Sequence, residues 1–392
     1  MSSLLIENCR PYDAPEGSAP QSVLVRDGVI ESVGGVIESV GAANTAGRPE
    51  QVLDAGGRTL APGFIDVHIQ GAGGADVLDA TPEALQALSR TCARFGTTGF
   101  LATTVYMPGK ENPHLRVAAE WSGRDLGGAH LLGIHLEGPF IAPEKRGMIQ
   151  PDCLAQPSPV VLDDIGALVG DRLSMMTIAP ELPGNGEMIG ALAGRGTVAS
   201  HGHSRATYEE TLAGFEAGIT HVTHLFNAMP SLHHRAPGPL AAIFERPDIT
   251  CQVIVDGVHI HPAVVRLAYQ ALGPERCVTI TDGTQALGLP DGRYVYHGLS
   301  YETQNGIARY VDGTLIGTAV GLDRMLARLV EYTGCPPAAA IRTVTENPAR
   351  LLGLEQSKGR IAPGYDADLV LLGPDFSVRA TIVGGRVVYR AA

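Results

Sequence analysis

The chain has 392 residues, of which 44% are hydrophobic, and is therefore long enough to bury a large core. Its 41 acidic residues outnumber its 29 basic residues, and the formal net charge of -12 argues against general binding to nucleic acid or anionic membranes. The six cysteines form no C-x-x-C pair, the first residues lack a signal-peptide pattern, and no apolar run could span a bilayer. We therefore expect a cytoplasmic protein with reduced thiols, and neither nucleic acid nor a membrane as its partner.

The first 60 residues are predicted to form short strands joined by turns. The segment SVLVRDGVIESVG alternates apolar and polar residues around Asp27-Gly28, a pair that is typical of a hairpin turn. The heptapeptide GVIESVG occurs twice in succession, at 28–34 and 35–41. Seven residues are too few for a solenoid repeat, so we expect a local duplication that lengthens a hairpin or forms a bulge.

From residue 61 apolar strands alternate with helical segments. Thr81 as N-cap, Pro82 at the first helical position and a closing Gly96 predict a helix over 81–96, and similar patterns occur at 208–218 and 262–273. This succession predicts an α/β fold, a (β/α)8 TIM-like barrel over 61–355 with its chemistry at the carboxyl ends of the strands. The eight predicted strands are 63–69, 98–104, 130–137, 173–179, 197–203, 219–225, 251–258 and 277–282.

After about residue 355 the chain returns to short strands, in KGRIAPGYDADLVLLGPDFSVRATIVGGRVVYR. Neither this segment nor the first 60 residues is long enough to bury a core alone. We therefore expect residues 1–60 and 356–392 to pair as one small β-sandwich domain, which the barrel interrupts in sequence.

Polar side chains end several of the predicted barrel strands. His68 ends the first strand, FIDVHI, but position 70 on the same strand face holds glutamine where a second histidine would complete a metal-binding pair. Glu137 ends the third strand in HLEGPF, where a carboxylate is costly to bury unless it is paired or bound to a metal. Taken alone, Glu137 fits equally well a residue that caps a loop amide.

Histidines end two successive strands. VASHGHS is predicted to place His201 and His203 on one strand face, and THVTHLFNAM supplies His221 and His224. A lone histidine at such a position is more often a hydrogen-bonded core residue, but two such strands together with Glu137 favour a metal site. Imidazole and carboxylate suit Zn²⁺ or Fe²⁺, and three protein ligands leave an open position for catalysis.

The last predicted strand ends in VTITDGT, which makes Asp282 a candidate general base; the alternative is an ordinary Asp-Gly turn. A second group of residues suits an anion, because NAMPSLHHRAPG contains Asn227, Ala228 and Arg235, and VDGVHIHP contains His259. An arginine in such a loop is usually only solvated. At the mouth of a barrel it can hold a phosphate through charge-assisted hydrogen bonds.

A series of motifs occurs in order along the chain: PGFIDVHIQG, HLEGPF, PEKRG, GHS, THLFNAM, DGVH, TDG, GLPDG, and ENPARLLGL with KGRIAPGYDADLVLL. Together these motifs resemble the N-acetylglucosamine-6-phosphate deacetylase family of the amidohydrolase superfamily. The resemblance runs from about residue 50 to the end, and HLEGPF with THLFNAM is its most selective part. It implies Glu137, His203 and His224 as ligands of the main divalent metal, for which we expect Zn²⁺ in preference to Fe²⁺. It also implies Asp282 as the catalytic residue.

The same resemblance implies that Asn227, Ala228, Arg235 and His259 bind the sugar phosphate of the substrate. Members of the family are typically homodimers with the arginine loop near the subunit interface. We therefore expect a homodimer in which Arg235 serves the active site of the neighbouring subunit.

The chain also departs from the family pattern. Members with His-X-His at the end of the first barrel strand bind two metals, whereas glutamine at position 70 is a poor ligand, so we expect a second metal to be absent or weakly bound. His68 is then a lining residue or a weak ligand of that second site. After PEKRG the family usually has a histidine that contacts substrate, whereas this chain has Met148 and Ile149. The tripeptide AGS, which is common in the family near the site, is replaced by IGT at 316–318. We place Met148, Leu315, Ile316 and Gly317 among the substrate-binding positions.

The expected reaction is hydrolysis of N-acetyl-D-glucosamine 6-phosphate to D-glucosamine 6-phosphate and acetate, in amino-sugar catabolism or recycling. The metal would acidify a water molecule, and Asp282 would take its proton and return it to the leaving amine. Three alternatives stay open: a deacetylase of the galactosamine epimer, another amidohydrolase such as a cyclic-amide hydrolase or deaminase, and a non-catalytic sugar-phosphate-binding protein. The intact candidate ligands and Asp282 argue against the last.

Overall fold

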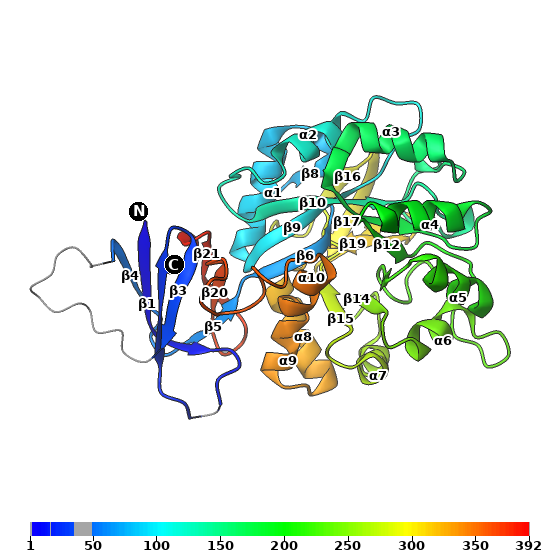
Figure 1. Ribbon diagram of the computed structural model, residues 1–392. Coiled ribbons are helices and arrows are strands. Elements are labelled where there is room, and N and C mark those ends of the chain that lie inside the picture. The colour runs from blue at the N-terminus through cyan, green and yellow to red at the C-terminus, as the bar shows by residue number, and fades with distance from the viewer. Residues whose placement is uncertain (1, 16, 35–48, 392) are drawn as a thin grey trace, which may run out of the picture.

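The computed structural model describes residues 2–15, 17–34 and 49–391 and shows a large barrel beside a smaller β-domain (Figure 1). Both ends of the described chain lie in the smaller domain, so the barrel is inserted between its two parts. The first copy of the repeated heptapeptide forms the turn at Gly28 and the strand β3 (Val29–Gly34). The second copy, at 35–41, lies outside the described residues.

Eight parallel strands, each hydrogen-bonded to the next, form the barrel wall and confirm the predicted (β/α)8 fold. The wall closes where Ile69 pairs with Gly283 in a parallel bridge. Because helices cover its outer face, strands such as β6 and β9 are buried along their whole length. The strands are β6 (Phe64–Ile69), β9 (Thr97–Thr104), β10 (His130–Glu137), β11 (Leu173–Ile178), β12 (Val198–His201), β13 (His221–Val222), β14 (Thr250–Ile254) and β15 (Cys277–Ile280).

Helices surround the wall (Figure 1). The side chain of Thr81 caps the first of them by accepting a hydrogen bond from the Ala84 amide, and Gly218 and Gly273 end α5 and α7, as the sequence predicts. The helices are α1 (Pro82–Arg94), α2 (Pro113–Trp121), α3 (Pro159–Val169), α4 (Asn185–Gly194), α5 (Tyr208–Ala217), α6 (Gly238–Glu245), α7 (Pro262–Leu272), α8 (Leu322–Thr333), α9 (Pro337–Arg342) and α10 (Glu346–Leu351).

Two barrel strands are shorter than the sequence predicts. β12 ends at His201 and β13 at Val222, whereas the patterns predict strands that reach residues 203 and 225. His203 and His224 follow these ends with φ angles of 48° and 26°, in the left-handed region that breaks the alternation of a strand. The prediction that His201 and His203 share a strand face is therefore wrong.

The smaller domain is one sheet with the strand order β22-β21-β20-β5-β1-β2-β3, and β4 pairs with β1. Its two chain segments join where β5 runs antiparallel to β20, with Leu60 opposite Leu371. Both segments contribute to one apolar core, which includes Ile6, Val23 and Ile382. This confirms the predicted β-domain built from both chain ends, while its residue boundaries stay a prediction. The strands not yet given are β1 (Ser3–Pro11), β2 (Gln21–Arg26), β4 (Gln51–Asp54), β5 (Thr59–Pro62), β20 (Leu369–Leu372), β21 (Val378–Val383) and β22 (Arg386–Arg390).

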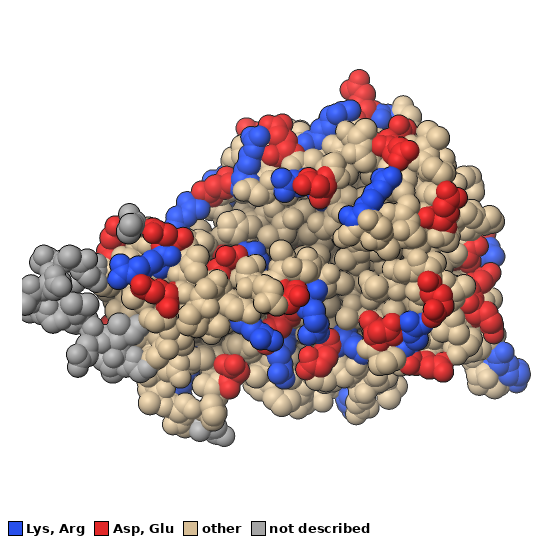
Figure 2. Space-filling view, viewed as in Figure 1, with Lys and Arg blue, Asp and Glu red and all other residues tan. Residues whose placement is uncertain are grey.

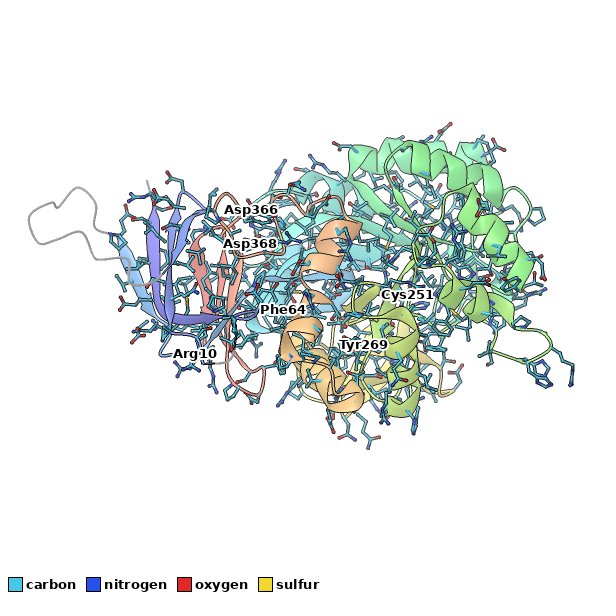
Figure 3. All side chains as sticks on the ribbon, turned by 60° about the horizontal axis from the view of Figure 1, so that its bottom comes forward. Arg10, Phe64, Cys251, Tyr269, Asp366 and Asp368 are labelled. Carbon is cyan, nitrogen blue, oxygen red and sulfur yellow. The ribbon has the colours of Figure 1, made fainter. Side chains whose placement is uncertain are left out.

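Packing and ion pairing join the two domains (Figure 3). Phe64, the first residue of β6, is fully buried at the junction. Asp368 lies just before β20, and its carboxylate is 3.7 Å from Nε2 of His130, the first residue of β10. Arg386 of β22 forms an ion pair with Asp125 of the barrel at 2.8 Å. The backbone amide of Gly63, just before β6, donates to the Asp368 carbonyl at 2.7 Å. The barrel and the β-domain therefore share hydrogen bonds as well as a core.

A four-stranded antiparallel sheet that the sequence analysis does not predict follows the last barrel strand. Its final strand returns to the barrel, because Thr318 pairs with Gly283 in a parallel bridge. The sheet thus stands at the carboxyl end of the barrel, and a short hairpin also follows β6. These strands are β16 (Arg293–Tyr296), β17 (Leu299–Gln304), β18 (Ile307–Tyr310), β19 (Leu315–Thr318), β7 (Gly71–Ala72) and β8 (Ala75–Asp76).

Positive and negative side chains are interspersed over the face of the molecule in Figure 2. This face therefore lacks the large basic patch that nucleic-acid binding requires. Among the helices of the described residues, none has both the length and the apolar character needed to cross a membrane.

Candidate active site

A cavity of about 250 Å³ lies at the carboxyl end of the barrel. Eleven of the thirteen site residues predicted from the sequence line it, whereas His68 and Arg235 do not. The lining residues are Gln70, Glu137, Glu144, Lys145, Gly147, Met148, His203, His224, Asn227, Ala228, His259, Asp282, Leu315, Ile316 and Gly317.

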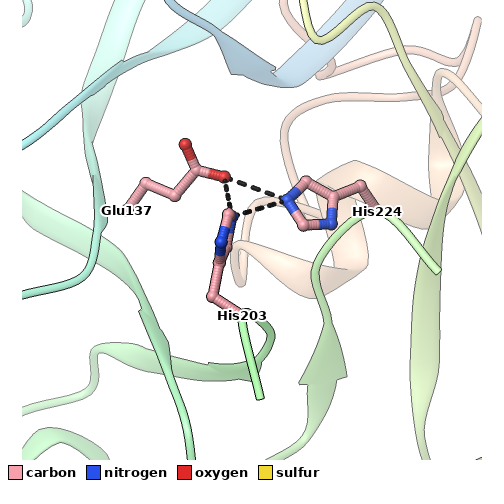
Figure 4. Close-up of side chains that lie close together, drawn as sticks. All are labelled: Glu137, His203 and His224. Atoms are coloured by element: carbon pink, nitrogen blue, oxygen red, sulfur yellow. Dashed lines mark hydrogen bonds and ion pairs between the residues drawn. The ribbon is translucent and has the colours of Figure 1, made fainter. Parts of the chain in front are cut away.

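Donor atoms of three side chains meet at one point of this cavity (Figure 4). Glu137 is the last residue of β10, and His203 and His224 lie two residues after the ends of β12 and β13. Glu137 Oε1 lies 2.9 Å from His203 Nε2 and 3.0 Å from His224 Nε2, and the two imidazole nitrogens are 3.0 Å apart. The three side chains are at most 6% exposed. Side chains that are far apart in sequence therefore form one compact group of nitrogen and oxygen donors.

The chemistry of this group fits a divalent metal. His203 Nδ1 donates to the Lys145 carbonyl at 2.7 Å, so the neutral ring presents a lone pair at Nε2. Two imidazole nitrogens and a carboxylate oxygen in such proximity repel one another unless a cation lies among them. Burial would raise the pKa of the Glu137 carboxyl, but its interactions with His203, His68 and His224 hold that pKa well below its usual range. Glu137 is therefore an anionic ligand.

His68 lies beside the donor group and is fully buried. Its Nε2 is 3.5 Å from Glu137 Oε1 and 3.3 Å from Asp282 Oδ1. Gln70, two residues along, lines the cavity with its amide nitrogen 3.5 Å from the same Asp282 oxygen. Because an amide replaces an imidazole at this position, the side of the site next to Asp282 offers only one nitrogen ligand.

The closure of the barrel fixes the position of Asp282. Its amide donates to the His68 carbonyl at 3.0 Å, and its carbonyl accepts from the Thr318 amide at 2.8 Å. Gly317, with φ of 125°, permits this close approach of β19, because a Cβ atom there would overlap the Asp282 carbonyl oxygen. The Asp282 side chain is 11% exposed and lines the cavity, so a small molecule can reach its carboxylate.

Gln252 on β14 orients two of these histidines. Its Oε1 accepts from His68 Nδ1 at 2.9 Å and from the His224 backbone amide at 3.2 Å. Because His68 donates through Nδ1, its Nε2 lone pair faces Glu137 and Asp282. Gln252 was not predicted from the sequence, since a single polar residue inside an apolar strand carries no local signal of its partners.

Replacing Gln252 by methionine is expected to weaken metal binding by about 10- to 100-fold, the usual effect of losing a partner that orients a ligand. Methionine fills a similar volume but accepts no comparable hydrogen bond, so His68 and His224 lose their common anchor. Zn²⁺ affinity is measured by competition with a chelator. Thr279→Val is the matched control, because it removes another buried barrel hydrogen bond, to Thr343, away from the cavity. An equal loss of affinity in the control would contradict the orienting role.

The two sides of the cavity differ in polarity. Met148 and Ile316 belong to a buried apolar cluster of the four-stranded sheet. On the polar side, His259 Nδ1 lies 2.6 Å from Asp256 Oδ2, which leaves Nε2 for a ligand. Burial would raise the pKa of Asp256, but hydrogen bonding and charge interaction with His259 lower it, so Asp256 stays ionised. The other lining residues are Asn227, Ala228, Lys145, Glu144, Gly147, Leu315 and Gly317.

Two polar residues on this side were missed from the sequence. Lys145 and Asp256 belong to the motifs PEKRG and VDGVHIHP, but neither residue was predicted to have a role. Lys145 lines the cavity, where its ammonium donates to the Met229 carbonyl at 3.3 Å. The sequence could have indicated Lys145 through its position in the loop that follows the strand of Glu137.

Arg235 does not reach the cavity of its own chain. It lies in the exposed loop between β13 and α6, where its Nη1 is 2.7 Å from His234 Nε2. The neighbouring Leu232 is 58% exposed. The expectation that Arg235 serves the active site of another subunit stays a prediction.

Comparison with known proteins adds relatives that match almost throughout. Residues 59–388 match the model of the amidohydrolase family. The chain is 37% identical over 339 residues to N-acetylglucosamine-6-phosphate deacetylase of Bacillus subtilis (strain 168), covering 84% of each protein. It is 34% identical over 340 residues to N-acetylgalactosamine-6-phosphate deacetylase of Escherichia coli O157:H7, covering 86% of this chain and 90% of the relative. The crystal structure of N-acetyl-D-glucosamine-6-phosphate deacetylase from Mycobacterium smegmatis superposes with a TM-score of 0.88 at 31% identity, covering 99% of this chain and all of the other.

Proposed function

The chain belongs to the amidohydrolase family, and from this premise we propose that it hydrolyses N-acetyl-D-glucosamine 6-phosphate to D-glucosamine 6-phosphate and acetate. The observation that carries the proposal is the convergence of Glu137, His203 and His224 on one point beside the carboxylate of Asp282. Metal-dependent amide hydrolysis uses such a constellation, and relatives with this named activity match the chain over most of its length.

Glu137, His203 and His224 would hold one divalent metal, which we propose to be Zn²⁺ because the donor set is two imidazoles and a carboxylate. When bound, the ion polarises the amide carbonyl and makes a water molecule more acidic. His68 and Gln70 provide at most a weak second position, so we propose one metal per subunit.

Asp282 moves the proton. Its carboxylate accepts a proton from the attacking water and donates it to the amine nitrogen, which is too basic to leave without protonation. The Gln70 amide nitrogen lies 3.5 Å from Asp282 Oδ1 and orients it. Backbone hydrogen bonds to His68 and Thr318 fix the main chain of Asp282 at the cavity.

The polar side of the cavity binds the sugar phosphate. Asn227, Ala228 and His259 line the cavity, and their proposed role is to orient the substrate. Met148, Leu315 and Ile316 form the apolar wall on the other side. Binding at both walls places the acetamido group between the donor group and Asp282.

The galactosamine epimer is the second candidate substrate, because a relative named for that epimer is nearly as similar as the relative named for glucosamine. Acetate release from both 6-phosphates by the purified protein separates the two. We expect the higher kcat/KM with the glucosamine epimer. A preference for galactosamine would select the second candidate, and release from neither would reject the deacetylase.

We also propose a cytoplasmic homodimer. All six cysteines are free and buried, as expected for a protein of a reducing compartment. The exposed loop with Leu232 and Arg235 offers an apolar contact and a cation to a second subunit. Such a dimer would complete each cavity with one arginine from the other chain.

Arg235→Ala is expected to raise KM by about 10- to 100-fold with little change in kcat, because a charged hydrogen bond contributes about 1.5–3 kcal/mol to binding. Steady-state kinetics measures the change. Arg195→Ala, which removes an exposed arginine paired with Asp163, is the control and should leave KM unaltered.

Mixing subunits tests where Arg235 acts. Refolding Arg235→Ala together with Asp282→Asn should restore about a quarter of the wild-type activity at low substrate, because half of the dimers then contain one complete site. Activity no higher than the sum of the two separate variants would contradict a site shared between subunits.

A further inference from the structure

A second group of metal-ligating side chains lies outside the active site. Ligand atoms of Asp152, Cys153 and His297 lie within 4.8 Å of one another. Asp152 and Cys153 form the 3-10 turn Pro151–Cys153 in the loop after β10, whereas His297 lies in the turn between β16 and β17. This group shares no residue with the donor group of Glu137, His203 and His224.

The surroundings of these side chains suit a cation. Cys153 is 1% exposed and packs with Val105, Ile141 and Ile149, so its thiol is shielded on one side by apolar groups. On the other side Asp152 is exposed and His297 is half-buried. The thiol lies 3.8 Å from Asp152 Oδ1. This contact joins two residues that are adjacent in sequence. It does not explain why the imidazole of His297, which comes from a distant hairpin, lies at the same point.

We propose that Asp152, Cys153 and His297 form a second metal site for a borderline-soft divalent cation of the Zn²⁺ class. Sulfur, nitrogen and one carboxylate oxygen are the donors that such ions prefer, whereas Mg²⁺ and Ca²⁺ require oxygen ligands. As the metal–sulfur bond forms, the thiol releases its proton to solvent and no group is oxidised or reduced. Three protein ligands leave the remaining position to water.

Such an ion would connect two walls of the active-site cavity. The loop that ends at Cys153 carries Lys145 and Met148, and the sheet that contains His297 carries Leu315 and Ile316. A metal held by both segments fixes the spacing between these walls. This ion would therefore be structural: it would lie next to the proposed substrate cavity and take no part in the reaction.

Titration of the purified protein with Co²⁺ tests the proposal. Only a sulfur ligand produces a near-ultraviolet thiolate-to-cobalt charge-transfer band, and the active-site donor group contains no sulfur. The band therefore reports on Cys153 whether or not the active site binds metal or the protein releases acetate. We expect a band that saturates at one sulfur-bound cobalt per chain.

Three variants locate the site. Cys153→Ser should abolish the band, and His297→Ala should raise the half-saturating Co²⁺ concentration by at least about tenfold, as losses around metal ligands commonly do. Cys9→Ser, a buried thiol of the β-domain that donates to the Gln21 carbonyl, should leave the band unchanged. Circular dichroism confirms that each variant is folded. No band in the wild-type protein, a band that persists in Cys153→Ser, or an unchanged titration in His297→Ala would overturn the proposal.

Discussion

Replacing Asp282 by asparagine is expected to lower kcat by about 100- to 10,000-fold, the usual contribution of a general acid–base residue. The amide has the same shape but cannot accept the proton of the attacking water or return it to the amine. KM should change little, because the lost interaction acts in the transition state. The backbone hydrogen bonds of residue 282 to His68 and Thr318 do not depend on its side chain, so the fold should persist.

Steady-state kinetics and elemental analysis of the purified variant check both parts of this expectation. Metal content should equal that of the wild type, since Asp282 is not among the three converging donors. Asp163→Asn, an exposed carboxylate on α3 paired with Arg195, is the control for a general effect of this substitution. Near-normal turnover in Asp282→Asn would remove Asp282 as the base.

Replacing Glu137 by glutamine is expected to abolish both metal retention and turnover. The amide keeps the volume of the side chain but removes the only anion from a donor group with two imidazoles. A bound metal stabilises the folded protein by about 4 kcal/mol when its free concentration is a thousand times its Kd. The variant should lose this contribution entirely.

Thermal melting with and without a chelator measures that loss. The wild-type protein should melt at a lower temperature when the metal is removed, whereas Glu137→Gln should melt at the same temperature in both conditions. Glu144→Gln is the matched control, because Glu144 lines the same cavity but is exposed and pairs with Arg205. A chelator effect of equal size in Glu137→Gln and the wild type would show that Glu137 does not hold the metal.

The barrel strands were predictable because each is a short apolar run bounded by turn residues. A closed (β/α)8 barrel also requires all eight of them. The four-stranded sheet was not. The strand β17 (Leu299–Gln304) exposes most of its side chains and buries only Tyr301 and Thr303, so no apolar run marks it. Its formation depends on contacts with Met148 and the barrel rim, which are distant in sequence.

The convergence of Glu137, His203 and His224 was predictable in outline, because the carboxyl ends of parallel strands meet at one rim. The details depended on backbone conformation. His203 leaves the strand in a left-handed turn, which directs it to the rim while His201 stays buried. Gln252 and Asp256 act through histidines, and no local pattern in the sequence shows which histidine a buried polar residue will contact.

The pairing of β5 with β20 governs when the smaller domain can be completed during synthesis. About three hundred residues separate Pro62 from Leu369, and translation at roughly 5–20 residues per second takes about 15 to 60 seconds to add them. During this interval the edge of β5 has no partner in its own chain, and an unpaired edge invites association with other chains. The nascent N-terminal strands therefore carry an uncovered edge until β20 emerges.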